Sequence, residues 1–188
     1  MIDEQVRAAM VKWPDVPAVY GWLRLDRRGQ WWLIDRGRPG FDEALHGLGS
    51  PITSPPIIDF IGRNYEHDAA GRWFWQNGPQ RVFVDLDLAP LILRVLGTGR
   101  DATLVTHTGW PIERIDRVSM TADGDVFVDT GMGPGAIYDL DLGTLEFDED
   151  PAAGPDGAAG VWLAGRRHAI VPHDPSQPPT FVTRPRAG

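Results

Sequence analysis

The most regular pattern in the chain is an alternation of hydrophobic and polar residues that follows Asn77-Gly78. Aliphatic residues stand at every second position from 82 to 88, and polar residues fill most of the positions between them. Because successive side chains of a strand point to opposite faces, the pattern predicts a strand with a core face and a solvated face. The core face would hold Val82, Val84, Leu86 and Leu88, and the solvated face Arg81, Phe83, Asp85 and Asp87.

The segment before this strand has the spacing of a helix. Hydrophobic residues recur every three or four positions at Ile57, Ile58, Ile61 and Tyr65. Ser54-Pro55 is a typical helix start, with a capping residue followed by proline at the first helical position. We therefore expect a helix over 55–65 that packs on the first sheet.

A hairpin connects the helix to the alternating strand. Trp73-Phe74-Trp75 predicts its first arm, and Asn77-Gly78 is a typical turn sequence. Pro79 lacks the N–H that would close a two-residue turn at Asn77-Gly78. We therefore expect a longer loop over 76–80.

Similar patterns predict the other elements. They are an amphipathic helix over 2–13, a hairpin with arms 16–25 and 30–35, a short turn of helix at 42–46, strands at 90–96 and 102–108, a hairpin with arms 117–121 and 126–129, a strand or short helix at 136–140, and a hairpin with arms 161–164 and 168–171. Asp123-Gly124 predicts a type I′ turn. Composition predicts a loop at 131–135, a flexible acidic loop at 148–160 and a proline-rich end.

Short sequences recur in the two halves of the chain. Val82-Phe83-Val84-Asp85 reappears as Val126-Phe127-Val128-Asp129, and Asp85-Leu86-Asp87-Leu88 as Asp139-Leu140-Asp141-Leu142. We therefore expect an α+β fold, predominantly antiparallel β, with two β-rich halves of repeated hairpin motifs. The expected parts are an N-terminal half at 1–97, a C-terminal half at 98–173 and a proline-rich tail at 174–188.

Several strings carry a resemblance to a known family. They are Gly21-Trp22-Leu23, Phe60-Ile61-Gly62-Arg63-Asn64-Tyr65, Gly71-Arg72-Trp73-Phe74, Gln76-Asn77-Gly78-Pro79-Gln80-Arg81-Val82 and His107-Thr108-Gly109. Over about 19–109 the chain resembles an uncharacterised bacterial, mainly proteobacterial, family of unknown function. The order of elements is more loosely similar to a second uncharacterised bacterial family, built from repeated β-rich motifs and suggested to take part in signalling. The second resemblance implies a two-part, repeated fold, and neither implies a catalytic residue.

Composition and charge narrow the classes of function. The 188 residues have a formal net charge of -8 and no cysteine, so a disulfide framework and a thiolate metal site are excluded and nucleic-acid binding is not expected. The first residues lack the basic and apolar regions of a signal peptide. No apolar run approaches the ~20 residues that span a bilayer. We expect a soluble cytoplasmic protein without a nucleic-acid or membrane partner.

Catalytic signatures are weak. Asp85 and Asp87 would lie about 7 Å apart on one strand face, a spacing that suits an acid and a base, but a plain solvated face explains them more simply. The histidines show no metal-ligand spacing, and no serine lies in a nucleophile elbow. We predict no catalytic residue, no metal and no cofactor, and keep a hydrolase that uses Asp85 or His107 as the alternative function.

Arginines and side-chain amides gather beside aromatic residues between 63 and 81. Guanidinium groups bind carboxylate or phosphate bidentately and stack on rings, so this set suits a small anionic or planar ligand. The predicted ligand-binding residues are Arg63, Asn64, Tyr65, Arg72, Gln76, Asn77, Gln80, Arg81 and His107. A purely structural role in a helix end, a turn and cross-strand pairs is the alternative.

The absence of catalytic motifs favours a binding function. Our hypothesis is a non-catalytic ligand- or partner-binding regulatory module that takes part in signalling. The alternation of strand residues predicts that Trp31 or Trp32 leaves the core face. That residue would be available to a protein partner or to a second copy of the chain in a homodimer.

Overall fold

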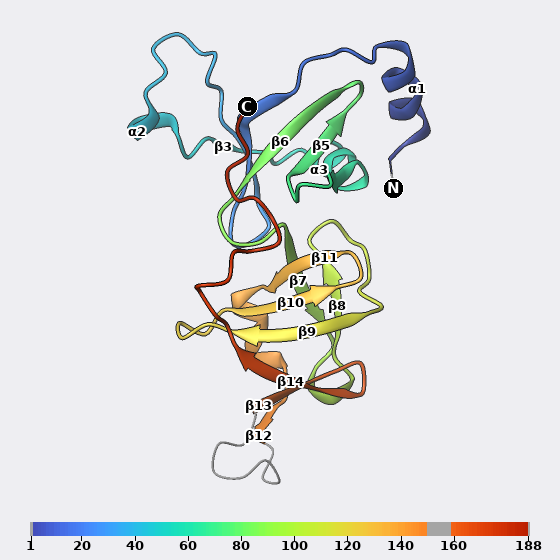
Figure 1. The fold of residues 1–188 in the computed structure, drawn as a ribbon, viewed down its shortest axis with the longest axis vertical. Coiled ribbons are helices and arrows are strands. Elements are labelled where there is room, and N and C mark those ends of the chain that lie inside the picture. Colours follow the sequence, from blue (N-terminus) through green and yellow to red (C-terminus); the bar gives the residue numbers. More distant parts are fainter. Residues whose placement is uncertain (1, 150–158, 188) are drawn as a thin grey trace. The chain divides into compact units, whose positions relative to one another are not determined.

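The computed structural model describes residues 2–149 and 159–187 and contains two compact units. Unit 1 comprises Met1–Leu88 and Thr180–Gly188, and unit 2 comprises Ala89–Pro179 (Figure 1). Compared with the expected parts, the first boundary lies after Leu88 rather than 97. The last residues of the expected tail belong to unit 1.

Unit 1 is built on a mixed six-stranded sheet with three helices. Its elements are α1 (Glu4–Lys12), β1 (Val19–Leu25), β2 (Trp31–Leu33), α2 (Glu43–His46), β3 (Ser50–Pro51), α3 (Pro55–Arg63), β4 (Tyr65–His67), β5 (Trp73–Asn77) and β6 (Gln80–Leu86). The strand order is β3-β2-β1-β6-β5-β4. β1 and β6 pair in parallel, and the other pairs of this sheet are antiparallel.

Strand β6 lies in the middle of this sheet and is buried on both faces. Val84 and Leu86 face the core as expected. On the opposite face, Phe83 stacks on Tyr20 with 4.7 Å between ring centroids, and Asp85 is only 1% exposed. The prediction of a solvated second face is therefore wrong for Phe83 and Asp85, because other segments of unit 1 cover them.

Helix α3 confirms the predicted helix, two residues shorter than expected. Ile61 is fully buried, and Phe60 meets Trp75 of β5 edge to face at 5.8 Å. Ile57 is 46% exposed, so it does not belong to the core stripe. Ser54 occupies the N-cap position, but its side chain makes no capping hydrogen bond.

The β5–β6 hairpin has a two-residue turn rather than the expected longer loop. Asn77 pairs with Gln80, so the turn residues are Gly78 and Pro79. Gly78 has φ +57°, as the first turn residue of a type II′ turn requires. Pro79 takes the second turn position, where no backbone N–H is needed to close the loop. The missing N–H of Pro79, which favoured a longer loop, is therefore compatible with a two-residue turn.

Unit 2 is built on a mixed eight-stranded sheet. Its elements are β7 (Leu91–Leu96), η1 (Gly99–Asp101), β8 (Thr103–Thr106), β9 (Ile115–Met120), β10 (Val126–Thr130), β11 (Gly133–Ile137), η2 (Asp139–Thr144), β12 (Phe147–Glu149), β13 (Ala159–Leu163) and β14 (Arg166–Pro172), where η marks a 3-10 helix. The strand order is β12-β13-β14-β9-β10-β11-β7-β8. Among the described strands of unit 2, β7–β11 and β9–β14 pair in parallel.

The turns of unit 2 differ from two expectations. Thr130 pairs with Gly133, so most of the expected loop at 131–135 belongs to β11. The β9–β10 loop has a positive φ at Gly124 but not at Asp123, so it is not type I′. Ala164 and Gly165 both have positive φ between Leu163 and Arg166, so the type I′ geometry occurs in the last hairpin.

The predicted fold class is confirmed, with one refinement. Both units are β-rich, but their sheets are mixed: unit 1 contains one parallel pair and the described part of unit 2 contains two. The second sequence repeat is not repeated structurally, since Asp85 lies in strand β6 and Asp139–Thr144 forms a 3-10 helix. The expected acidic loop at 148–160 lies largely outside the described residues. The described chain contains no helix with the length and hydrophobicity needed to cross a bilayer.

Candidate functional site

The C-terminal segment is an integral part of unit 1. The amide of Val182 donates to the carbonyl of Gly71 at 2.9 Å, and the amide of Leu86 donates to the carbonyl of Thr183 at 2.9 Å. The segment is not a strand, but it is hydrogen-bonded both to Leu86 at the end of β6 and to Gly71, two residues before β5. Because alternate residues of an extended chain share a side, Arg184 and Arg186 can reach the same group.

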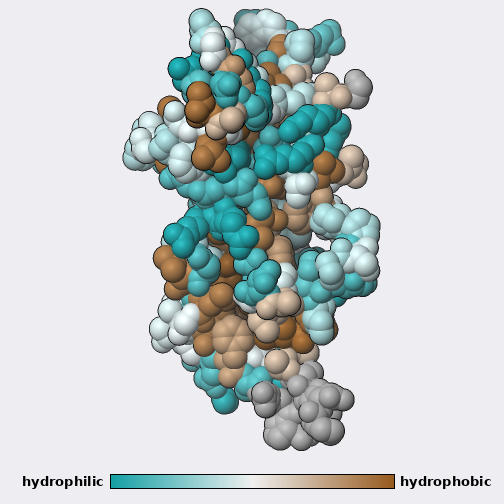
Figure 2. Space-filling model, turned by 90° about the vertical axis from the view of Figure 1, so that its left-hand side faces the viewer, coloured by the Kyte–Doolittle hydropathy of each residue, from teal (hydrophilic) through white to brown (hydrophobic). Residues whose placement is uncertain are grey.

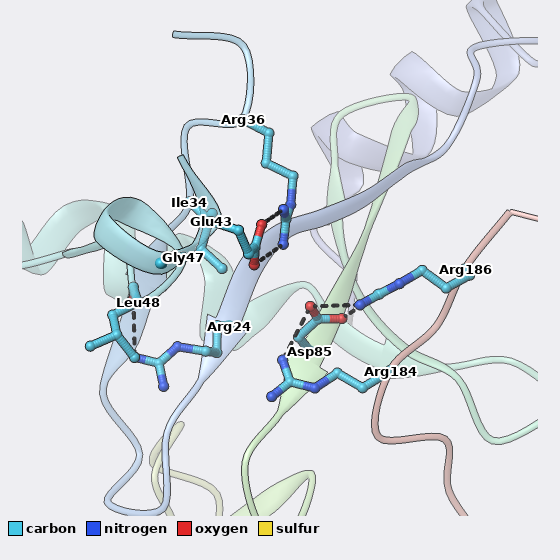
Figure 3. A pocket seen from close by; sticks show the side chains of 10 residues that line it. Arg24, Ile34, Arg36, Glu43, Gly47, Leu48, Asp85, Arg184 and Arg186 are labelled. Carbon is cyan, nitrogen blue, oxygen red and sulfur yellow. Dashed lines mark hydrogen bonds and ion pairs between the residues drawn. The ribbon is translucent and has the colours of Figure 1, made fainter. Parts of the chain in front are cut away.

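That group is the buried carboxylate of Asp85. Arg186 Nη1 donates to Asp85 Oδ1 at 2.8 Å, and Arg184 Nη1 lies 3.3 Å from Asp85 Oδ2 (Figure 3). Arg184 Nη2 also lies 3.6 Å from Asp87 Oδ1. Both contacts of Arg184 are ion pairs, and its guanidinium forms no hydrogen bond with a described residue. Both arginines are about half exposed, so their outer donors face solvent.

Arg24 of β1 is the next cation in this region. It stands beside Asp85 in the parallel β1–β6 register, pairs with Asp87 and donates to the carbonyl of Leu48 at 3.0 Å. Its guanidinium lies 5.1 Å from the ring of Trp32. Arg24 is buried, yet its Nε has no hydrogen-bond partner among the described residues.

Arg36 and Glu43 form a bidentate ion pair on the other side. Arg36 Nε donates to the carbonyl of Gly21 at 2.6 Å, and its two Nη groups donate to the Glu43 carboxylate. These hydrogen bonds hold the pKa of Glu43 below its ordinary value and raise the pKa of Arg36. Gly21 has φ +72°, and an added Cβ would lie 2.9 Å from Arg36 Nε, so this close approach requires glycine.

Together these side chains line a cavity of about 650 Å³, which we call the arginine pocket (Figure 3). Its lining is Arg24, Ile34, Arg36, Glu43, Ala44, Gly47, Leu48, Asp85, Arg184 and Arg186. Four arginines face two carboxylates, so the lining carries a formal excess of two positive charges. Guanidinium groups with free donors bind carboxylate and phosphate well, so the pocket suits a small anion.

The structure places the first four predicted ligand-binding residues in internal contacts. Arg63 forms an ion pair with Asp3, and buried Asn64 accepts a hydrogen bond from the Asp3 amide. Tyr65 packs against aromatic rings of the sheet, and burial raises its pKa. Arg72 forms an ion pair with Asp68 at 2.7 Å. These contacts explain how the residues hold unit 1 together.

The next four predicted residues come together on the β5–β6 hairpin. Gln76 pairs with Arg81 and Asn77 with Gln80 across the strands. Gln80 Nε2 donates to the carbonyl of Pro17 at 3.1 Å, which ties the hairpin to the segment that follows α1. Gln76 and Arg81 line a second cavity, separate from the arginine pocket.

His107 belongs to unit 2, whereas the other eight predicted residues belong to unit 1. Its Nδ1 accepts a hydrogen bond from the Ile92 amide at 3.2 Å. Burial lowers its pKa from 6.5 to about 4, so its imidazole is neutral near pH 7. The described residues contain no group of three or more potential metal-ligating side chains.

Sequence reasoning did not identify the arginines of the pocket. Arg24 and Arg36 stand in different segments, and Arg186 is separated from Asp85 by 101 positions in the sequence. One local signal was present: Arg184 and Arg186 flank Pro185, so an extended segment presents both guanidinium groups on one side.

Known proteins support the fold and leave the site unassigned. The chain matches the family DUF2944, described as "Protein of unknown function (DUF2946)", over residues 2–174. No curated protein is similar to the chain. Among solved structures, a DUF1285 family protein from Silicibacter pomeroyi DSS-3 is 18% identical with a TM-score of 0.52, over 81% of this chain and 80% of that chain.

A second DUF1285 family protein, from Shewanella baltica OS155, is 14% identical with a TM-score of 0.43, over 63% of this chain and 85% of that chain. The similarity to the Silicibacter protein shows a common fold. Both resemblances drawn from the sequence, to one uncharacterised family and more loosely to another, are thereby confirmed.

Proposed function

Because this chain belongs to the DUF2944 family, whose function is unknown, its role has to be inferred from its own residues, and we propose that it is a non-catalytic binding module for a small anion. The ligand carries carboxylate or phosphate groups and binds in the arginine pocket. The observation that carries the proposal is the convergence of four arginines on one cavity with two carboxylates.

The donors that remain available support an anionic ligand. Arg184 is within ion-pair distance of Asp85 and Asp87 but forms a hydrogen bond with neither. Arg24 contributes its positive charge to the pocket wall, whereas its unpartnered Nε is buried and does not reach a ligand directly. A ligand with two anionic groups could engage both ends of the pocket, and each charge-assisted hydrogen bond is shorter and stronger than a neutral one.

The same contacts make the alternative, a hydrolase that uses Asp85 or His107, less favourable. Both oxygens of the Asp85 carboxylate lie against guanidinium groups, so a substrate would have to displace an arginine to reach them. The Nδ1 of His107 is engaged by a backbone amide. In our proposal Asp85 orients the arginines and takes no part in a reaction.

Isothermal titration with inorganic phosphate, succinate and citrate tests the proposal. At least one of the three should bind saturably to the full-length protein. The double variant Arg184→Gln/Arg186→Gln should bind that anion at least tenfold more weakly, which corresponds to about 1.4 kcal/mol. Arg114→Gln controls for the loss of a surface charge, because Arg114 is an exposed arginine in unit 2 that pairs with an exposed aspartate.

Two results of this titration would contradict the proposal. Equal loss of affinity in the Arg114→Gln control would mean that the anion responds to overall charge. Absence of binding by all three anions would reject the pocket.

We also retain four broader parts of the proposal: a protein partner, a homodimer, a role in signalling and a cytoplasmic location. In Figure 2, hydrophobic and hydrophilic residues are interspersed on the visible faces of both units, which does not favour one partner surface.

A further inference from the structure

The second cavity of unit 1 has a different chemistry from the arginine pocket. It has a volume of about 440 Å³ and lies between the segment that follows α1 and the β5–β6 hairpin. Its lining is Met10, Trp13, Pro14, Val16, Ala18, Gln76, Pro79 and Arg81. Six of the eight residues in this lining, which we call the Trp13 pocket, are apolar and none is acidic. Its volume falls in the range of small-molecule sites.

Arg81 supplies the positive charge of the Trp13 pocket. Its side chain is exposed and lies 4.7 Å from the ring of Phe74. Its guanidinium forms no ion pair and no hydrogen bond with any described residue. A guanidinium that is held by stacking alone keeps all its donors for a carboxylate.

Trp13 supplies an aromatic surface beside this charge. It is 49% exposed, although a large aromatic residue is usually covered. The ammonium group of Lys12 lies 4.4 Å from the centre of its ring, which adds a second cation on this side of unit 1. Pro14 and Pro79 provide further flat apolar surface in the same lining.

Gln76 adds a buried polar group to the wall. It is 1% exposed and stands opposite Arg81 in the antiparallel pair, so the two side chains share a face of the sheet. Its Nε2 donates to the carbonyl of Gly78 at 2.9 Å, whereas its Oε1 has no partner in the described part of the chain. A buried acceptor without a donor is uncommon, but this oxygen is inaccessible and a carboxylate has no donor to offer it, so Gln76 shapes the wall without bonding the ligand.

From the cavity, the unpaired Arg81 and the exposed Trp13 we propose that the Trp13 pocket binds a planar aromatic carboxylate. The ring lies against Trp13 and the prolines, and the carboxylate pairs with the fork of Arg81. Two of the residues that the sequence pointed to, Gln76 and Arg81, thus belong to this site. The proposal does not depend on the arginine pocket, which suits compact anions without a ring.

Nuclear magnetic resonance titration of the full-length protein tests this inference, with benzoate as the probe. The indole N–H signal of Trp13, assigned by its loss in Trp13→Phe, should shift saturably with benzoate. Cyclohexanecarboxylate has the charge without the planar ring, and benzamide has the ring without the charge. Each should bind at least tenfold more weakly than benzoate, a difference of about 1.4 kcal/mol.

Variants then separate this site from the arginine pocket. Arg81→Gln should weaken benzoate binding at least tenfold, and Arg81→Lys, which keeps the charge but not the fork, should weaken it less. Arg184→Gln/Arg186→Gln should leave benzoate binding at Trp13 unchanged. An unshifted Trp13 signal, or an affinity that Arg81→Gln does not alter, would overturn the proposal; loss of phosphate binding alone would concern only the arginine pocket.

Discussion

At the residue scale, Asp85 organises the arginine pocket. It is buried, and it faces two guanidinium groups that arrive from the C-terminal segment. A buried charge is tolerated only when it is paired and hydrogen-bonded, so the carboxylate and the two arginines depend on one another. The stability of unit 1 and the shape of the pocket are therefore linked through a single side chain.

Replacing Asp85 with asparagine should expose this dependence. Asp85→Asn removes the charge that pairs with Arg184 and Arg186, and loss of a hydrogen bond to a charged group costs about 1.5–3 kcal/mol. We expect urea unfolding to show a loss of this order. Asp116→Asn, at an exposed pair with Arg114, should cost less than about 1 kcal/mol; equal losses would contradict the role assigned to Asp85.

His107 should make the stability of unit 2 depend on pH. Its folded pKa of about 4 is lower than its ordinary value of 6.5 because of burial. Between these values the unfolded chain binds more protons than the folded chain, so stability falls as the pH decreases. The full effect is about 3 kcal/mol, present above pH 6.5 and lost as the pH falls through 4.

Denaturant unfolding of wild type and His107→Gln at pH 7 and pH 5 measures this contribution. The wild type should lose more stability between the two pH values than the variant does, because glutamine does not titrate. Identical pH dependence in the two proteins would show that His107 is not the responsible group.

At the element scale, the C-terminal segment is held by a close approach to Gly71. The amide of Val182 donates to the Gly71 carbonyl, and a Cβ at Gly71 would lie 2.5 Å from the carbonyl oxygen of Thr180. Gly71 also has φ +72°, a conformation that other residues rarely adopt. The segment thus needs glycine here for space as well as for backbone conformation.

Two glycine variants separate these effects. Gly71→Ala and Gly40→Ala both place alanine at a positive φ, +72° and +70°, but nothing lies within 4 Å of the added Cβ at Gly40. Both should lose about 1 kcal/mol from backbone strain. Only Gly71→Ala should displace the segment, seen as faster hydrogen exchange of the Val182 amide. Equal exchange rates in the two variants would contradict this account.

At the scale of the whole molecule, unit 1 is discontinuous and unit 2 is continuous in the sequence. The β7 to β14 sheet uses residues from 89–179 alone, whereas Leu86 of β6 donates a hydrogen bond to Thr183, nearly a hundred residues later. Each unit has its own buried core, since Val84 and Ile61 belong to the first and Ile92 and Val128 to the second. Separate folding of such units is the usual behaviour of domains.

Three fragments test this organisation. Residues 89–179 should fold alone, with a cooperative thermal transition. Residues 1–88 joined by a short Gly/Ser linker to 180–188 should be more stable than 1–88 alone, because only the joined fragment contains Arg184 and Arg186. A short linker suffices because Leu86 and Thr183 are hydrogen-bonded in unit 1. Equal stability of the two unit 1 fragments would contradict the structural role of the C-terminal segment.

Local patterns in the sequence determined the elements of this protein. The helix before Arg63, the two arms of the β5–β6 hairpin and the first hairpin lie where periodicity and turn residues place them. These features depend on neighbours a few positions apart, which is the range over which side-chain periodicity acts. The β-rich class of both units follows from them.

The tertiary structure decided which surfaces meet. The alternation around Asp85 predicts a solvated face, but Arg24 from β1 and Arg186 from the far end of the chain lie against that face. The period of a strand defines its two faces without saying how many of them are covered. Parallel pairing, the arginine pocket and the burial of Asp85 all arise from contacts between distant segments, for which the local pattern carries no signal.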